Sequence, residues 1–167
     1  RKDRAVKAAL FVGGWEGHTP THFADWFKGL LEENGFEVAV YDTLEPLERP
    51  EDLADVDLIT PIWSSARSGH RDEFGNMTKP QEDGLLKLIG DGCGLAGWHG
   101  HMGDAFRDRP TYHFLIGGQF VAHPPGWPDN LQPTEDYIDY DVTICQPDHP
   151  LVEGIRSFRI RSEQYYM

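Results

Sequence analysis

A pair of histidines gives the clearest chemical signal in the sequence. His99 and His101 lie in the segment Gly97-Trp98-His99-Gly100-His101, where an apolar run ends in small residues. A strand that ends in such an elbow and enters a helix can hold one side chain at the edge of a sheet. Neutral imidazole serves as a general base or as a metal ligand. We therefore predict catalytic roles for His99 and His101, with packing as the alternative.

Metal binding is a second interpretation of the same pair. His99 and His101 are separated by one residue, so both imidazoles can face one ion if the backbone stays extended. Zinc then needs a third protein ligand, for which His18, His123 and Glu163 are candidates. A zinc ion on His99, His101 and His18 therefore stays open beside the acid–base role. No other cofactor is indicated, since the glycine-rich fingerprints of dinucleotide and phosphate loops are absent.

Alternating strands and helices must position these residues. Apolar runs of strand length occur at residues 7–14, 37–42, 56–63, 94–98, 141–145 and 158–161. Helical patterns lie between them, first at residues 20–34 and again at 79–90. This order predicts an α/β fold with a doubly wound, mostly parallel sheet.

Three local features carry more specific expectations. Thr19-Pro20 is typical of a helix N-cap followed by proline, and the apolar stripe that follows places Trp26 in the core. Pro61 marks an early end or a bulge in its strand. The stretch 110–140 is rich in glycine, proline and aromatic residues, and we expect it to be a functional loop.

Ligands of open parallel sheets bind outside the carboxyl ends of the strands. Several chemically active residues follow the predicted strands, namely Trp15, Glu16, His18, Asp42, Trp63, Ser64, Trp98, His99, His101 and Asp104. Aromatic faces beside acids and histidines suit a ligand with apolar C–H faces and hydroxyl edges, such as a sugar. We therefore predict substrate-binding roles for Trp15, Glu16, His18, Trp63, Trp98 and Asp104. For Asp104, a helix start is the alternative reading, because a carboxylate is favoured there.

Composition limits the partners. The 167 residues carry a formal net charge of −13, which disfavours nucleic acid and anionic membranes. No apolar run reaches the ~18 residues of a membrane-spanning helix. The length predicts a single domain over residues 1–167, and two cysteines fit a reducing, cytoplasmic compartment. Acids at the predicted rim, namely Glu16, Asp42, Asp72, Glu73 and Asp104, favour neutral sugars over sugar phosphates.

The sequence resembles the ThuA-like (trehalose utilisation) family. The resemblance rests on residues 13–20, on 97–106, and on later pieces at 112–124, 149–155 and 162–165. It implies a flavodoxin-like, class I glutamine amidotransferase-like three-layer sandwich. His99 takes the position of that superfamily's nucleophilic cysteine, so glutamine amidotransferase activity is not expected. Family members usually continue beyond the Glu163 region, so we expect the chain to be truncated at its C-terminal end.

The resemblance also extends the functional predictions. It implies use of trehalose or related disaccharides through 3-keto-sugars, with substrate-binding roles for His123 and Tyr165 and an acid–base role for Glu163. We thus expect a sugar isomerase, lyase or hydrolase, which can assemble as a homo-oligomer. A non-catalytic sugar-binding module and a zinc-dependent hydrolase remain the alternatives.

Overall fold

The computed structural model describes residues 4–64, 76–121, 123 and 137–167. The chain forms two compact units, Arg1–Gln119 and Phe120–Met167. Each unit is described by itself below. The expectation of a single domain over 1–167 stays a prediction.

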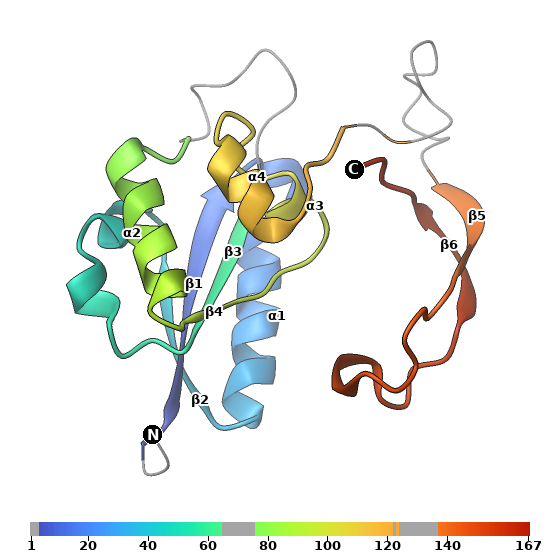
Figure 1. The fold of residues 1–167 in the computed structure, drawn as a ribbon, viewed down its shortest axis with the longest axis horizontal. Helices are drawn as coiled ribbons and strands as arrows, with labels where there is room; N and C mark the ends of the chain where they lie inside the picture. The colour runs from blue at the N-terminus through green and yellow to red at the C-terminus, as the bar shows by residue number, and fades with distance from the viewer. Residues whose placement is uncertain (1–3, 65–75, 122, 124–136) are drawn as a thin grey trace. The chain divides into compact units, whose positions relative to one another are not determined.

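A parallel sheet forms the centre of the first unit. Its strands are β1 (Val6–Gly14), β2 (Phe36–Tyr41), β3 (Leu58–Ser64) and β4 (Gly94–Leu95), in the order β2-β1-β3-β4. All of the paired strands run parallel. Helix α1 (Pro20–Glu33) covers one face, and α2 (Lys79–Gly90) lies on the other (Figure 1). The predicted doubly wound α/β fold is confirmed, with the strand order of flavodoxin-like proteins.

Strand β1 is buried because both of its faces pack against helices. Leu10 and its alternate neighbours lie in the cluster of α1, together with Ala24 and Leu31. Phe11 lies in the opposite cluster, with Leu85 of α2. Two short 3-10 helices, η2 (Glu45–Glu48) and η3 (Pro50–Leu53), complete that second layer with Leu47 and Leu53. Near-continuous apolar runs are typical of parallel strands enclosed in this way.

The prediction that Pro61 ends or bulges its strand is wrong. Strand β3 continues through Pro61, which pairs with Phe11, as far as Ser64. Ile59 accepts the last hydrogen bond from the β4 side, donated by Ala96. Alternate residues of a strand direct their backbone groups to the same side, so the missing N–H of Pro61 faces a side where pairing has already ended.

Helix α1 begins at Pro20 with Thr19 as its N-cap, as predicted, although Thr19 has the left-handed φ of +46° and its side chain makes no cap hydrogen bond. The prediction for Trp26 is wrong. Trp26 is 55% exposed rather than buried in the core. The buried side of α1 is formed by Ala24 and Leu31, whereas the ring of Trp26 packs edge-on against Trp98, with centroids 6.1 Å apart.

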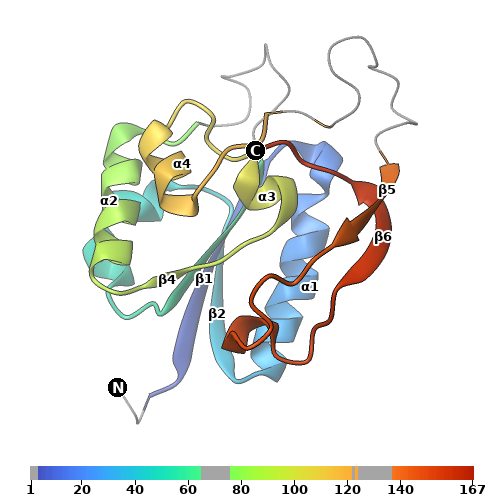
Figure 2. The same ribbon diagram turned by 45° about the vertical axis from the view of Figure 1, so that its right-hand side comes forward.

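The irregular stretch predicted for 110–140 contains ordered elements at both ends. Helix α4 spans Pro110–Ile116, after the short α3 (His99–Gly103). In the second unit, β5 (Tyr137–Val142) and β6 (Phe158–Glu163) pair antiparallel, with η4 (Pro150–Val152) between them (Figure 2). These two strands form a separate sheet from β1–β4. In the described part of the chain, no helix has the length and apolar character that crossing a bilayer requires.

Candidate functional site

Three of the predicted histidines meet at the carboxyl ends of the strands in the first unit. His18 belongs to the turn η1 (Glu16–His18) after β1, whereas His99 and His101 belong to α3 after β4. The ring of His18 lies 5.2 Å from that of His99 and 5.6 Å from that of His101, centroid to centroid. Two segments about eighty residues apart in the sequence thus supply one histidine cluster.

His99 occupies an elbow, as the sequence predicted. Trp98 is extended, and α3 begins at His99, whose φ is +51°. A non-glycine residue in this region carries backbone strain, and strained residues gather at functional sites. The side chain is exposed, at the first residue of α3. The elbow therefore leaves an imidazole accessible beside His18.

His18 is held from two sides. Its Nδ1 lies 2.8 Å from the hydroxyl oxygen of Ser64, the last residue of β3. A Cβ built on Gly100 would come within 2.3 Å of His18 Cε1, so only glycine allows this approach. The ring of Trp15 stands edge-on to His18, with centroids 4.8 Å apart. Ser64 and Gly100 thus determine where the imidazole lies.

His101 is the buried member of the cluster. Its side chain is 1% exposed and lies against the rings of Phe23 and Trp98. Burial, followed by the nearby His18 and His99, lowers the pKa of His101 to about 4 from its ordinary 6.5. Its Nδ1 is buried without a hydrogen-bond partner among the described residues. His101 is therefore neutral at pH 7, and its buried ring packs beneath the exposed part of the cluster.

The three tryptophans predicted at the rim take different places. Trp15 is half-buried beside His18. Trp98 is also half-buried, and its ring packs against Phe27 of α1 at 4.9 Å. Trp63 is 8% exposed and lies in the core, 6.3 Å from the ring of Phe106. Trp15 and Trp98 are therefore the tryptophans of this group that contact the histidine cluster, Trp15 at His18 and Trp98 at His101.

The predicted acidic residues also differ in their exposure. Glu16 is exposed beside the cluster in η1. Asp104 is 6% exposed and forms an ion pair with Arg107, whose Nη2 lies 2.8 Å from Oδ2. Asp104 follows the C-terminal end of α3, so its alternative reading as a helix start is wrong. Asp72 and Glu73 lie outside the described residues.

The remaining predicted residues lie in the second unit. The rings of His123 and Tyr165 are 5.0 Å apart, and Phe120 contacts both. His123 Nδ1 lies 3.2 Å from the carbonyl oxygen of Gln164. Glu163 is half-buried in β6, and its carbonyl oxygen accepts a hydrogen bond from the Tyr140 hydroxyl. His123, Tyr165 and Phe120 thus form one aromatic cluster, and the substrate-binding roles of His123 and Tyr165 stay predictions.

The described residues do not fit a metal centre. In the part of the chain that the structure describes, no group of three or more histidine, cysteine, aspartate or glutamate side chains could hold an ion. Within the histidine cluster, Nδ1 of His18 is directed at Ser64, and His101 is enclosed by aromatic rings. Zinc on His18, His99 and His101 therefore stays a prediction without support from this arrangement.

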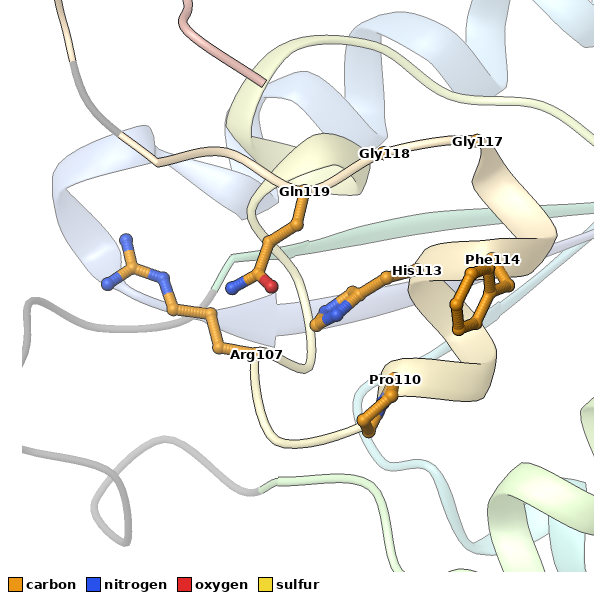
Figure 3. Close-up of a pocket in the computed structure, with 7 residues that line it drawn as sticks. All are labelled: Arg107, Pro110, His113, Phe114, Gly117, Gly118 and Gln119. Atoms are coloured by element: carbon orange, nitrogen blue, oxygen red, sulfur yellow. The ribbon is translucent and has the colours of Figure 1, made fainter.

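The sequence did not single out a hollow beside α4. The hollow has a volume of about 410 Å³, within the range common for small-molecule sites. Phe114, 86% exposed, and His113 stand beside it in Figure 3, with Gln119 and Arg107 further along the wall. Its glycines, Gly117 and Gly118, belong to the segment 112–124 that carries part of the family resemblance. The residue types that line it are common on surfaces, so no sequence signal marked it.

Comparison with known proteins identifies the family. The model of the family described as ThuA, trehalose utilisation, matches residues 7–167. The chain belongs to the ThuA family. A solved ThuA-like protein from Bacteroides uniformis superposes with a TM-score of 0.69 at 20% identity, and the match covers 99% of this chain. This chain spans 62% of the length of that protein. No curated protein matches the sequence.

The structural match supports the fold of this ThuA family member. Identity of 20% is too low to transfer an activity, so the neighbour speaks for the α/β architecture alone. Trehalose utilisation is the description of the family, not an activity observed for this chain. The chemistry has to be argued from the histidine cluster itself.

Proposed function

We propose that this ThuA family member is an enzyme that acts on a neutral disaccharide or keto-sugar by acid–base chemistry. One observation carries the proposal: His99 is exposed at a strained elbow, with its ring 5.2 Å from that of His18. Two imidazoles at this spacing can act on one substrate from adjacent positions. The family description, trehalose utilisation, supports the choice of a sugar.

The chemistry assigned to His99 is removal of a proton from the carbon next to a sugar ketone. The proton moves to the imidazole of His99, and the electron pair moves into an enolate. A hydrogen-bond donor at the enolate oxygen lowers the barrier, and His18 is the adjacent group that can provide it. Return of the proton at a different position gives isomerisation, and loss of a leaving group from the next carbon gives β-elimination.

The surroundings of the cluster favour a neutral substrate. His101 is uncharged at pH 7 because its pKa is lowered to about 4. Glu16 adds a carboxylate in η1, and the chain as a whole carries a net charge of −13. A phosphorylated sugar would be repelled by this field. We also propose an acid–base role for Glu163 of the second unit, which the variant Glu163→Gln tests in the exchange assay described next.

The test follows proton exchange rather than a particular product. The protein is incubated in D₂O with trehalose, maltose, sucrose and their 3-keto derivatives, and deuterium entering the sugar is measured by NMR. Loss of a general base typically costs about 10²- to 10⁴-fold, so His99→Ala should lose exchange by that factor. His22→Ala, on the exposed side of α1, is the matched control. Full exchange by His99→Ala on every active sugar contradicts the proposal.

Two alternatives give different results in the same preparation. Saturable sugar binding in calorimetry, with no exchange and no product, indicates a sugar-binding module, for which the half-buried Trp15 beside His18 is the supporting observation. Stoichiometric zinc in elemental analysis, with activity lost on chelation, indicates the zinc-dependent hydrolase.

A further inference from the structure

Ser64 carries a buried hydroxyl that contacts His18. Its side chain is 0% exposed at the end of β3, and its Oγ lies 2.8 Å from Nδ1 of His18. We propose that Ser64 is a positioning residue that fixes the proton of His18 on Nε2, so that His18 meets the substrate as a hydrogen-bond donor. This inference rests on the proposed function only for its last step, the role toward substrate.

The backbone holds both partners of this contact in place. The N–H of Trp15 donates to the carbonyl oxygen of Ser64 at 3.1 Å, and the N–H of His18 donates to the carbonyl of Trp15 at 3.1 Å. Gly14, with φ of +83°, lets the strands approach, since a Cβ there would come within 2.2 Å of the Ser64 carbonyl oxygen. The turn that carries His18 is thus tied to the residue that its imidazole contacts.

The burial of the hydroxyl decides the direction of the hydrogen bond. If Ser64 donates to Nδ1, both groups are satisfied and the proton of neutral His18 resides on Nε2. If Nδ1 carries the proton instead, the Ser64 hydroxyl hydrogen has no acceptor among the described residues. A buried donor without a partner costs about 1–3 kcal/mol. The first arrangement is therefore favoured.

Gly100 keeps the ring in the orientation that this contact needs. The atoms of His18 nearest to a Cβ built on Gly100 are Cε1 at 2.3 Å, Nδ1 at 2.9 Å and Nε2 at 3.2 Å. The Cε1 corner of the imidazole therefore faces Gly100, while Nδ1 reaches Ser64. Because Nδ1 is occupied by Ser64, any hydrogen bond that His18 donates to a sugar oxygen comes from Nε2. A neutral imidazole donor of this kind can polarise a carbonyl without carrying charge.

The first measurement needs no substrate. Long-range ¹H–¹⁵N correlation spectra of the uniformly labelled full chain at pH 8 report which nitrogen of each imidazole carries the proton, and His18→Gln identifies the His18 signals by their disappearance. We expect His18 to show a protonated Nε2 and an unprotonated Nδ1. A protonated Nδ1 would overturn the inference, whatever the enzyme does.

The second measurement compares two buried hydroxyls of the same strand. Ser64→Ala removes the contact to His18, and we expect the Nδ1 signal to shift and the single proton position to be lost. Thr60→Val is the matched control, because Thr60 is also 0% exposed on β3 and its hydroxyl has no partner among the described residues. It should leave the His18 signals unchanged. Ser64→Cys, which restores a weak donor of similar size, should recover part of the wild-type pattern.

Turnover separates the positioning role from the proposed function. If sugars are processed, Ser64→Ala should lower kcat by about ten-fold or more with little change in KM, as when a transition-state donor is weakened. Unchanged kcat in Ser64→Ala, or His18 signals that are the same in Ser64→Ala as in the wild type, would overturn the inference. Labelling of Ser64 by a fluorophosphonate would also overturn it, by making Ser64 a nucleophile. Failure of every sugar, with the predicted His18 spectrum intact, counts against the proposed function alone.

Discussion

Acid should destabilise the protein through His101. The ordinary pKa of histidine is 6.5, and burial with the neighbouring His18 and His99 lowers that of His101 to about 4. Between these two values the unfolded chain binds a proton at this residue and the folded chain does not. The free energy of unfolding therefore falls as the pH drops from above 6.5 toward 4, and this contribution is fully present only above 6.5.

The size of the effect follows from the same two values. The two pKa values differ by about 2.5, and one pKa unit corresponds to about 1.4 kcal/mol, so His101 accounts for at most about 3–4 kcal/mol. This is a large share of the free energy of unfolding of a typical domain, which is about 5–15 kcal/mol. The 1% exposure of the side chain is the structural reason for so large an effect.

The free energy of unfolding is measured by urea titration, monitored by tryptophan fluorescence, at pH 7.5, 6.5, 5.5 and 4.5, each about one unit apart. The metal-free wild type is compared with His101→Leu, so that the titration of the carboxylates cancels. His22→Gln, on the exposed side of α1, controls for the loss of one imidazole from the unfolded chain. The advantage of wild type over His101→Leu should shrink as the pH falls. A difference that is constant from pH 7.5 to about 4.5 would refute the reasoning.

Three further substitutions test the packing around the site. Gly100→Ala should displace the imidazole of His18, because the new Cβ would lie 2.3 Å from Cε1, and should abolish the His18 NMR pattern while costing about 1–3 kcal/mol in urea unfolding. Gly84→Ala should cost more than a typical helix substitution, since its Cβ would lie 1.7 Å from the backbone oxygen of Leu47; a neutral result would show that α2 and η2 do not pack this closely. Leu10→Ala, in a fully buried strand, should cost about 2–5 kcal/mol, and a loss below about 1 kcal/mol would contradict the core assignment.

The predictions from sequence succeeded where a local pattern has one physical meaning. The apolar run before Gly14 and the helix over 79–90 are both present, because apolar periodicity reports directly which residues face a core. The elbow at His99 was also visible, since small residues between a strand and a helix permit a sharp turn. Trp26 was misplaced because a wide apolar stripe on a helix does not say which of its edges meets the sheet.

The sequence predicted which residues lie near the site but not how deeply each side chain is buried. Strand ends marked His18, His99 and His101 as neighbours, because carboxyl ends of parallel strands share one edge. Trp63 and Trp15 both follow predicted strands and were both expected at the rim. Trp63 is buried in the core, whereas Trp15 lies beside His18. Distance along the chain from a strand end does not tell how a side chain turns.

The sequence by itself determined the α/β fold, the family and the candidate histidines, since apolar periodicity and short motifs are written locally along the chain. Only the tertiary structure decided that His101 is buried, that His99 is exposed, and that Ser64 holds His18. These properties depend on contacts between residues far apart in the sequence, such as the 2.8 Å between Ser64 and His18. Burial and hydrogen bonding set the charge and the proton position of an imidazole, so the chemistry of the cluster is a property of the folded chain.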